Sequence, residues 1–266
     1  LCAKCGLKFI GPSGDVIRQM GSKAAAKALM RRSGVPVVPG SEGAVDLEEA
    51  RRVADEVGYP VLVKASAGGG GRGMRRVDRP EDLPALFQAA QSEAVACFGN
   101  GELYVEKLIL HPRHIAFQIL ADSQGNVIHL GERDCSIQRK NQKLIEESPS
   151  RALTPQLREE MGQAAVRAAR AAHYESAGTI EFVLDEDGRF YFIEMNTRIQ
   201  VEHPVTEFVT GLDLMREQLR IAAGLPLSVG QEEVRLSGCA MECRINAEDP
   251  REGFRPSPGR VEFLHL

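Results

Sequence analysis

The sequence has 266 residues, a hydrophobic content of 43%, a charged content of 26% and a formal net charge of −4. This composition is typical of a globular protein with one large or two small domains, and the acidic balance argues against a general nucleic-acid partner. No apolar run approaches the roughly 20 residues that cross a bilayer, so a membrane partner is not expected either. Six cysteines spread along the chain indicate reduced thiols in a cytoplasmic protein, and the lone Cys2–Cys5 pair lacks the second pair of a zinc site.

The first part of the chain alternates between helices and strands. Ala, Met, Lys and Arg favour a helix in the first helical segment, and apolar residues recur at helical spacing in the second. Helices are predicted over residues 15–33, 47–57 and 83–96. Strands are predicted over residues 34–40, 61–65, 74–77 and 103–108.

Strands dominate the middle of the chain, where two turns rich in Asp, Asn and Gly separate them. Further strands are predicted over residues 114–121, 127–134, 179–184, 189–196 and 260–265. Further helices are predicted over residues 155–173, with Thr154 as the N-cap, and over residues 212–223. The pattern predicts an α+β fold with a small lobe over about residues 36–108 and a larger lobe that contains a mixed sheet.

A glycine-rich segment follows the strand that delivers Lys64. Four consecutive glycines, Gly68 to Gly71, are followed by Arg72 and Gly73. Glycines allow backbone N–H groups to approach and surround a phosphate, and the lysine adds a positive charge at the end of the strand. Because the lysine precedes the glycines, the segment differs from the Walker A pattern. A flexible hairpin tip is the alternative, but Lys64 shifts the balance toward nucleotide binding.

Glu194 and Asn196 lie two residues apart in an apolar strand, and Glu181 lies in the strand before it. Alternate residues of a strand share one face. With an even-numbered loop between the strands, Glu181 lies opposite Phe192 and one diagonal step from Glu194, so the carboxylates face the same side. Together with the Asn196 oxygen they would suit Mg²⁺ or Mn²⁺. An odd-numbered loop would place them on opposite faces and favour two solvated glutamates.

Polar residues continue at the same spacing beyond this strand. Arg198 carries a planar guanidinium that matches a carboxylate or bicarbonate, and Gln200 and Glu202 follow it. Glu202 could act as a general base beside Arg198 and is preferred to the adjacent His203, which is a second candidate. The alternative is a surface ion pair worth about 0–1 kcal/mol.

Taken together, these segments closely resemble the biotin carboxylase family of ATP-grasp enzymes. The matching segments cover essentially the whole chain in order: residues 20–23, 64–74, 105–107, 112–114, 132–138, 142–143, 181–182, 194–206 and 242–250. Residues 194–206 are the most specific part, because other ATP-grasp ligases share only the Glu-x-Asn pattern. One departure is Asn141, where many relatives have histidine; asparagine can still hydrogen-bond a ribose hydroxyl, but it cannot titrate.

The resemblance implies an ATP-grasp fold that binds ATP between its two lobes, with the glycine segment as a lid. The residues expected to bind ATP are Lys23, Lys64, Gly70, Gly71, Met74, Glu106, Lys107, Leu108, Ile109, His114, Gln138, Asn141, Glu181 and Glu194. Those expected to bind Mg²⁺ or Mn²⁺ are Glu181, Glu194 and Asn196. Those expected to bind bicarbonate or biotin are Lys143, Arg198, Gln200, Val201 and Arg244, of which Arg244 would hold the ureido oxygen of biotin.

The implied activity is the ATP-dependent carboxylation of biotin by bicarbonate, through carboxyphosphate, as in the first half-reaction of an acyl-CoA carboxylase such as acetyl-CoA carboxylase. Arg198, Glu202 and Lys143 are the expected catalytic residues, with Glu202 as the base that deprotonates bicarbonate. Biotin would be presented by a biotin carboxyl carrier protein or domain. A carboxyltransferase is a further expected partner, and the family commonly forms homodimers.

The resemblance also divides the chain into parts. Residues 1–20 would be the tail of an N-terminal domain, residues 21–224 the ATP-grasp domain, and residues 237–266 the start of a C-terminal domain. Because the chain begins without methionine and ends inside a predicted strand, we expect it to be a fragment. The alternatives are an ATP-grasp ligase of the carbamoyl-phosphate type, which Arg244 and residues 200–204 argue against, and a fragment that binds ATP without turnover.

Overall fold

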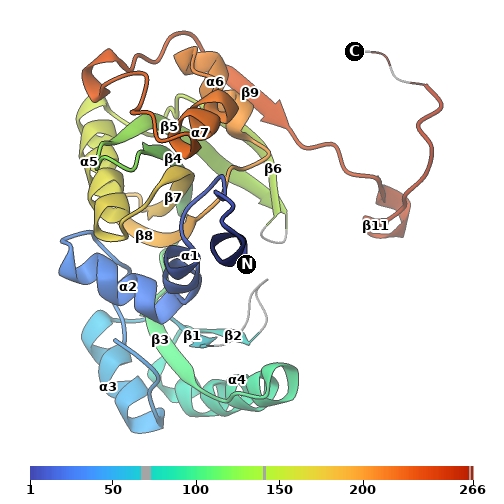
Figure 1. The fold of residues 1–266 in the computed structure, drawn as a ribbon. Coiled ribbons are helices and arrows are strands. Elements are labelled where there is room, and N and C mark those ends of the chain that lie inside the picture. Colours follow the sequence, from blue (N-terminus) through green and yellow to red (C-terminus); the bar gives the residue numbers. More distant parts are fainter. Residues whose placement is uncertain (67–72, 140–141, 264, 266) are drawn as a thin grey trace.

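The computed structural model describes residues 1–66, 73–139, 142–263 and 265, and it shows two lobes with one main sheet each (Figure 1). The small lobe contains a three-stranded antiparallel sheet in the order β2-β1-β3. Its strands are β1 (Val61–Ala65), β2 (Met74–Val77) and β3 (Leu103–Lys107). Helices α3 (Leu47–Val57) and α4 (Leu83–Phe98) share one apolar core with this sheet, and a 3₁₀ turn (Pro80–Asp82) precedes α4.

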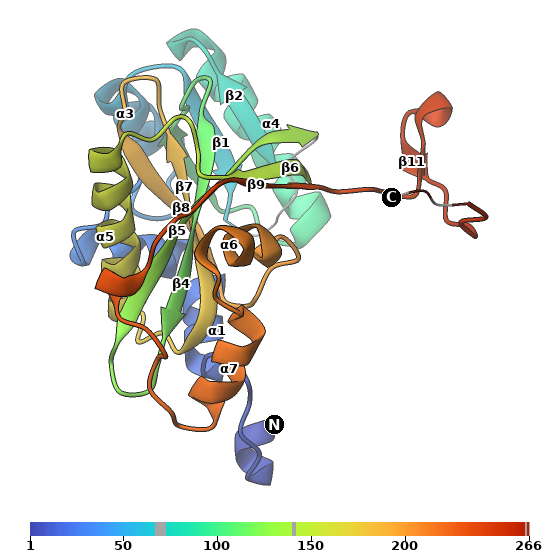
Figure 2. The same cartoon turned by 90° about the horizontal axis from the view of Figure 1, so that it is seen from above.

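The large lobe contains a six-stranded sheet in the order β8-β7-β4-β5-β6-β9, in which neighbouring strands pair antiparallel. Its strands are β4 (Arg113–Ala121), β5 (Val127–Arg139), β6 (Gln142–Ser148), β7 (Ser176–Leu184), β8 (Phe190–Asn196) and β9 (Ala240–Cys243). Helix α5 (Pro155–Ala171) covers one face, and α6 (His203–Thr210) and α7 (Leu214–Ala222) cover the other (Figure 2). Successive residues of β4 alternate between these faces, because Ile119 packs in the cluster with α5 and Leu120 in the cluster with α7.

The N-terminal segment forms a 3₁₀ turn (Cys2–Cys5) and two helices, α1 (Gly14–Gly21) and α2 (Lys23–Arg32), which pack in the same core as α5. The sequence predicts one helix here. Ser22 has an extended backbone, however, and its hydroxyl caps α2 by accepting from the N–H of Ala25. Because an N-cap residue is non-helical, Ser22 divides the predicted helix in two.

The segment between α2 and α3 connects the two sheets. Val37 forms a parallel bridge to Phe192 of β8, which makes the large sheet mixed, and Gly40 forms an antiparallel bridge to Glu106 of β3. A Cβ atom at Gly40 would lie 2.2 Å from the carbonyl oxygen of Val105, so glycine is required for this approach. The strand predicted here is thus limited to isolated bridges, which hold the two sheets beside a common cleft.

Three elements of the large lobe, β6, α6 and β9, are not predicted by the sequence, whereas the other predicted strands and helices of the lobes are confirmed, with differences at their ends that are largest for β5. After a 3₁₀ turn (Gln231–Glu233) and β9, the chain leaves the body of the molecule (Figure 1). It then forms a small hairpin from β10 (Glu248–Asp249) and β11 (Arg255–Pro256), with a 3₁₀ turn (Pro250–Glu252) between them. Residues 260–263 contain no strand, so the strand predicted there is wrong; among the described residues, no strand pairs with this segment.

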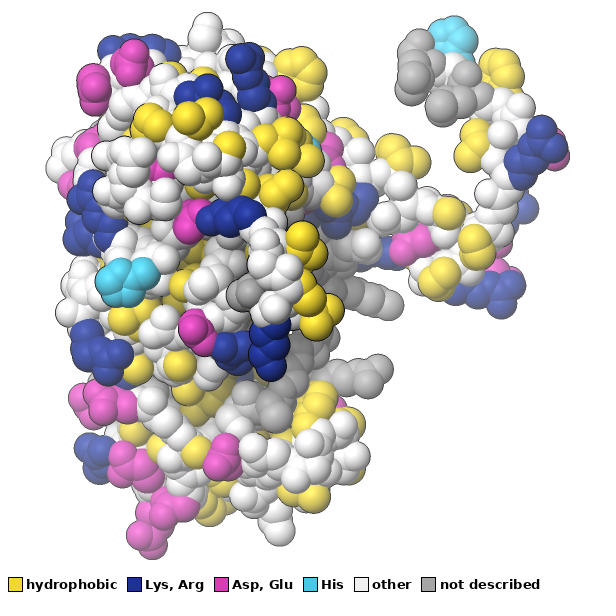
Figure 3. Space-filling view, viewed as in Figure 1, with side chains coloured by type: hydrophobic (Ala, Val, Ile, Leu, Met, Phe, Trp, Pro, Cys, Tyr) yellow, Lys and Arg dark blue, Asp and Glu magenta, His cyan; other side chains and the backbone are white. Residues whose placement is uncertain are grey.

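Charged side chains of both signs are interspersed over the face shown in Figure 3, and apolar side chains gather over α6 and α7. The exposed apolar residues of these helices include Phe208, Met215 and Leu219. The helices within the described part of the chain are too short or too polar to cross a bilayer.

Candidate active site

A cavity of about 330 Å³ lies between the two lobes. Its walls come from α2, from β1 and β3 of the small lobe, and from β7 and β8 of the large lobe. The residues expected to bind ATP that line it are Lys23, Lys64, Glu106, Lys107, Leu108, Ile109 and Glu194. Val38, Leu62 and Phe192 add apolar surface to the same walls. Apolar walls with a few charged groups are typical of a pocket for a small molecule.

The charges in this cavity are mainly positive. The carboxylate of Glu106 is buried and contacts both Lys27 and Lys64, with 2.5 Å between Lys64 Nζ and Glu106 Oε2. Lys23 lies in the same wall. Burial lowers the pKa of Lys27 and of Lys64, and the charges of neighbouring lysines lower it further. Two lysines at one carboxylate, with Lys23 in the same wall, leave an excess of positive charge, which suits the phosphates of a nucleotide.

The other residues expected to bind the nucleotide differ in their contacts and in their positions relative to the cavity. The amino group of Lys107 donates to the carbonyl oxygens of Gly58 and Tyr59, at 2.9 Å each, and so caps the end of α3. Met74 pairs with Lys64 across β1 and β2, so both side chains lie on the same face of the small sheet. Three residues expected to bind ATP lie outside the described residues: Gly70, Gly71 and Asn141.

The two expected metal carboxylates, Glu181 of β7 and Glu194 of β8, lie directly opposite each other and face the same side of the large sheet. An odd number of residues joins the two strands, whose last pair before this loop is Leu184 with Phe190. If the pairing continued without interruption from there, Glu181 would lie opposite Ile193. A register shift beside Glu181 places one extra residue in β8 and brings Glu194 into the opposing position. The predicted pairing of Glu181 with Phe192 is therefore wrong, and the shared face depends on a bulge.

Glu181 is the centre of a buried hydrogen-bond network. Its Oε1 accepts from Lys143 Nζ at 2.8 Å, from Asn196 Nδ2 at 2.8 Å and from Gln200 Nε2 at 3.0 Å. Its Oε2 lies 2.5 Å from Nε2 of His114. Burial alone would raise its pKa, but the hydrogen bond and charge of His114 and the charge of Lys143 outweigh burial and hold the pKa of Glu181 well below its ordinary value.

His114 is itself held in place, because the amide of Gln138 lies 2.8 Å from its Nδ1. Contacts at both ring nitrogens fix the orientation of the imidazole beside Glu181. The sequence prediction placed His114 and Gln138 at the nucleotide, and the structure brings both to the carboxylate next to the nucleotide cavity.

The expected metal ligands fit a site in which the protein and a bound nucleotide hold the metal ion together, better than a site made of protein ligands alone. Glu181, Glu194 and Asn196 offer hard oxygen ligands, and the Asn196 oxygen also accepts from Arg198 at 3.4 Å. In the ranges that the structure describes, there is no cluster of three His, Cys, Asp or Glu side chains placed to hold a metal ion. Two carboxylates nevertheless suffice for Mg²⁺ when nucleotide phosphates and water complete its coordination.

Glu202 immediately precedes α6 and is 5% exposed. Its carboxylate oxygens lie 3.5 Å from Lys143 Nζ and 3.3 Å from Arg244 Nη2. Burial raises its pKa, but a backbone hydrogen bond and the charges of Lys143 and Arg133 outweigh burial and hold the pKa of Glu202 below its ordinary value. Glu202 is therefore ionised at neutral pH, as a base must be. The ring of His203, by contrast, lies 2.7 Å from a backbone carbonyl oxygen.

Arg198 and Val201 lie on the open side of this network. Arg198 is exposed, and its guanidinium contacts the backbone oxygen of Ile199 at 3.2 Å. Val201 is 71% exposed, whereas the neighbouring Gln200 is buried. An anion entering from solvent would meet the Arg198 guanidinium first and then the amide and ammonium groups behind it.

Three charged residues of the site are absent from the predicted set: Lys27, Arg133 and Glu146. Lys27 lies one helical turn after Lys23, so its spacing could have placed it on the same face of α2. Arg133 of β5 and Glu146 of β6 are brought to the site by strand pairing across the sheet. Local sequence spacing contains no signal for them.

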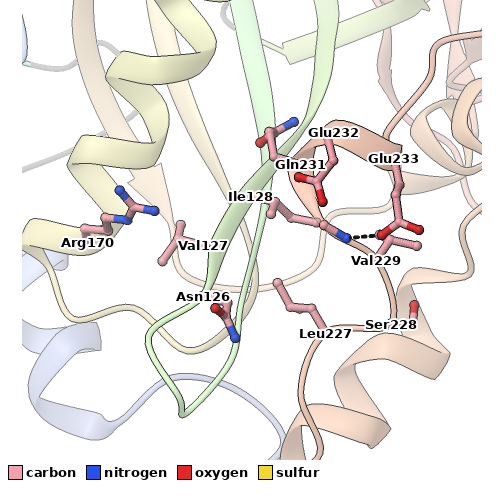
Figure 4. A pocket seen from close by; sticks show the side chains of 11 residues that line it. Asn126, Val127, Ile128, Arg170, Leu227, Ser228, Val229, Gln231, Glu232 and Glu233 are labelled. Atoms are coloured by element: carbon pink, nitrogen blue, oxygen red, sulfur yellow. Dashed lines mark hydrogen bonds between the residues drawn. The ribbon is translucent and has the colours of Figure 1, made fainter.

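Two other cavities lie away from this cleft. A cavity of about 470 Å³ is bordered by Asn126, Val127, Ile128, Arg170 and residues 227–233 (Figure 4). Another of about 530 Å³ shares Gln231 and Glu232 with it. The residues that line these two cavities include none of the predicted site residues. The sequence predictions therefore converge on the cleft between the lobes and on the network beside it.

The comparison with protein-family models matches residues 22–229 to the family described as "Carbamoyl-phosphate synthase L chain, ATP binding domain". The chain belongs to this family. It is 63% identical to the biotin carboxylase of a Nostoc species and 59% identical to the chloroplastic biotin carboxylase of Arabidopsis thaliana. These alignments cover 98% of this chain but 59% and 49% of the two relatives, so the chain spans about half to three fifths of their length.

Solved structures give the same picture. The biotin carboxylase domain of 2-oxoglutarate carboxylase from Hydrogenobacter thermophilus is 58% identical, with a TM-score of 0.88 over 96% of this chain and 56% of that one. Biotin carboxylase from Campylobacter jejuni is 52% identical, with a TM-score of 0.89 over 97% of this chain and 58% of that one. The ATP-grasp fold and the similarity to biotin carboxylases predicted from the sequence are thereby confirmed.

Proposed function

We propose that this protein catalyses the ATP-dependent carboxylation of biotin by bicarbonate. The observation that carries the proposal is one continuous arrangement of charges in the cleft. A cation-rich cavity for a nucleotide adjoins the Glu181–Glu194 pair, and Lys143 and Glu202 lie directly behind that pair. Carboxylation of biotin with ATP and bicarbonate needs a nucleotide site, a metal site and a bicarbonate site side by side, because bicarbonate must meet the γ-phosphate.

The complexes of similar proteins support the ligands of this proposal. The Hydrogenobacter thermophilus structure is described as a dimer in complex with MgADP, ADP and bicarbonate. The Campylobacter jejuni structure is described as a complex with beta-gamma-ATP. A nucleotide, Mg²⁺ and bicarbonate are the three species that the cleft of this chain suits by its charges.

The nucleotide end of the cleft positions the phosphoryl donor. Lys23 and Lys64 would bind phosphate oxygens, and the apolar wall that includes Ile109 would hold the base. Glu181, Glu194 and Asn196 would hold Mg²⁺ or Mn²⁺, which neutralises charge on the transferring phosphoryl group when it is bound. The lysines supply the remaining positive charge from a pre-organised cavity, which favours the transition state over the bound substrate.

The bicarbonate end of the cleft supplies the nucleophile. Arg198, Gln200 and Lys143 would orient bicarbonate while Glu202 removes its proton. A bicarbonate oxygen then attacks the γ-phosphorus, and the bond to the β-γ bridging oxygen breaks, which yields carboxyphosphate and ADP. Carboxyphosphate releases CO₂, the departing phosphate takes the N1 proton of biotin, and N1 captures CO₂. Arg244 would stabilise the negative charge on the ureido oxygen of biotin.

The direct test measures ATP cleavage by the protein expressed from its complete coding sequence, with and without bicarbonate and free biotin. We expect ADP release to require bicarbonate and to increase with biotin. ATP cleavage that is indifferent to both would overturn the proposal. Stimulation by ammonia rather than biotin would instead support a ligase of the carbamoyl-phosphate type, which the family description makes the relevant alternative.

Partners follow from the same reaction. Biotin would arrive on a biotin carboxyl carrier protein or domain, and a carboxyltransferase would use the carboxybiotin. Similar proteins include the small subunit of a 2-oxoglutarate carboxylase and one subunit of a pyruvate carboxylase, which supports a multi-subunit carboxylase. Because those names differ in their final acceptor, the biotin half-reaction is the shared part; acetyl-CoA carboxylase remains one of the candidate assemblies, and co-purification with a carboxyltransferase tests it.

A further inference from the structure

Glu146 of β6 is a buried carboxylate beside the bicarbonate end of the cleft, and the proposed reaction gives it no role. It is 3% exposed. Its Oε2 accepts from Arg133 Nε at 3.2 Å, and its Oε1 lies 3.6 Å from Lys143 Nζ. Within the described ranges, Oε1 accepts no hydrogen bond from a donor group, and the carboxylate of Glu202 lies close to that of Glu146. A buried anion with one unsatisfied oxygen costs free energy, so its presence here requires an explanation.

Arg133 provides the first part of that explanation. Its guanidinium is fully buried and donates to Gln200 Oε1 at 2.5 Å and to Thr206 Oγ1 at 2.8 Å. Because Gln200 uses its oxygen toward Arg133, its Nε2 must point to Glu181, where it donates at 3.0 Å. Arg133 therefore fixes the orientation of the Gln200 amide and ties the sheet to α6, the helix that Glu202 precedes.

Glu146 is the counter-ion of this guanidinium. Among the described side chains, it is the carboxylate that Arg133 contacts, whereas the other acceptors of Arg133 are neutral. A buried guanidinium without a counter-ion is strongly unfavourable, so loss of the Glu146 charge would displace Arg133 or draw water to it. Either change would release the Gln200 amide.

Lys143 provides the second part. Its ammonium group lies among three carboxylates, at 2.8 Å from Glu181, 3.5 Å from Glu202 and 3.6 Å from Glu146. Glu181 alone would draw the ammonium group toward the metal side of the network. The other two carboxylates come from β6 and from the residue before α6, so they compete with Glu181 of β7 for the ammonium group and restrain it.

We propose that Glu146 is a positioning residue of the bicarbonate site. As the counter-ion of Arg133 it fixes the amide of Gln200, and as a third neighbour it restrains Lys143. This inference rests on the proposed function, because it assigns Glu146 to the same reaction. A buried ion pair that only stabilises the fold is the competing explanation, and it predicts no selective effect on bicarbonate.

The test compares Glu146→Gln with Glu147→Gln, which changes the neighbouring half-exposed carboxylate of the same strand. In bicarbonate-dependent ATP cleavage by the complete protein, we expect Glu146→Gln to raise the KM for bicarbonate about tenfold or more, which is the effect that loss of a residue supporting a ligand has at metal sites. The KM for ATP should stay within about twofold, since Glu146 does not line the nucleotide cavity. Glu147→Gln should leave both constants unchanged.

A pH profile adds a readout that a structural ion pair would not move. Glu146 is faced by Lys143 of β6, Arg133 of β5 and Glu202 before α6, and it pairs with Glu242 of β9. Burial raises the pKa of Glu146 to about 7; Lys143 and Arg133 lower it, and Glu202 raises it. We expect kcat/KM for bicarbonate to show an ionisation near neutral pH that Glu146→Gln removes.

Glu146→Asp keeps the charge but shortens the side chain by one methylene. It tests the inference in place of Glu146→Gln if that variant fails to fold. A folded Glu146→Asp with a raised KM for bicarbonate supports the inference. Wild-type bicarbonate kinetics in either folded variant overturns it, while bicarbonate-dependent activity of the parent protein leaves the proposed function intact. A parent protein without that activity overturns the proposed function itself, so the two failures are distinguishable.

Discussion

The nucleotide cavity and the network around Glu181 are adjacent, but their charges are arranged in opposite ways. In the cavity, Lys27 and Lys64 contact the carboxylate of Glu106, and Lys23 lines the same wall. In the network, three carboxylates surround the ammonium group of Lys143. The first arrangement leaves surplus positive charge, whereas in the second Arg133 and Arg244 pair with Glu146 and Glu202 and balance the carboxylates, although both lie in one cleft.

This difference in charge would place the nucleotide phosphates and the metal ion in separate parts of one cleft. It does not require two domains of different composition. Surplus lysines favour phosphate oxygens, and closely placed carboxylates favour a divalent cation and an active base. Glu194 lies at the boundary, because it lines the cavity and also faces Glu181. The γ-phosphate of a bound nucleotide would therefore be placed where the two regions meet, next to the bicarbonate residues. Each prediction below removes one charge from one of these two regions.

The largest expected effect is on the acidic side. Glu202→Gln keeps the size and hydrogen-bonding ability of the side chain but removes the base, so kcat for bicarbonate-dependent ATP cleavage should fall by about 10²–10⁴-fold. ATP affinity, measured by calorimetry, should be unchanged, because Glu202 does not line the cavity. Glu186→Gln, in the exposed turn between β7 and β8, is the control and should be fully active. Full activity of Glu202→Gln would remove Glu202 from the role of base.

Glu181→Gln should affect folding as well as metal binding. The pKa of Glu181 is held well below its ordinary value, so its ionised form stabilises the fold at pH values above that ordinary value, and this contribution is lost as the pH falls below it. Breaking such a buried pair typically costs about 3–5 kcal/mol, and we expect a loss of that order at pH 7.

The measurement is urea unfolding at neutral and at acidic pH. The difference between wild type and Glu181→Gln should shrink as the pH falls through the ordinary range of a glutamate, about 4. Glu159→Gln, on the outer face of α5, is the control and should show no such convergence. Unfolding curves of wild type and Glu181→Gln that stay equally far apart at both pH values would contradict the assignment.

On the basic side, Lys64→Met should weaken ATP binding selectively. Loss of one charge-assisted contact to a phosphate is typically worth about 1.5–3 kcal/mol, so we expect the dissociation constant for ATP to rise about 10–100-fold. The KM for bicarbonate should change little once ATP is saturating. Equal losses for ATP and bicarbonate would show that the two regions are not separable in the way their charges indicate.

The residues of the sequence predicted Lys64, at the end of a strand before a glycine-rich segment, whereas the other residues of the cavity were named from the resemblance to the biotin carboxylase family. Neither route predicted the geometry of this comparison. The partners that come from separate strands, Arg133 and Glu146, were missed because strand pairing decides which residues meet. Period-two alternation also could not reveal the bulge beside Glu181, since a bulge is an interruption of that alternation.

The errors in secondary structure have similar causes. Ser22 favours a cap as well as a helix, and its capping hydrogen bond decides in favour of the cap. The short helix α6 was missed because it begins at His203-Pro204, where proline at an early helical position also fits a turn. Neither choice is determined by local propensity, and both are settled by packing against the large sheet.

The smallest expected effect comes from a lysine that the sequence assigned to the nucleotide and that the structure uses otherwise. The amino group of Lys107 is committed to the carbonyl oxygens of Gly58 and Tyr59. Lys107→Met should therefore lower the free energy of unfolding by about 1–2 kcal/mol, through the loss of two hydrogen bonds, and leave ATP affinity unchanged. It is the matched partner of Lys64→Met, since both changes remove a lysine from the wall of one cavity. If Lys107→Met weakened ATP binding as much as Lys64→Met, proximity to the cavity rather than the direction of each ammonium group would determine nucleotide binding.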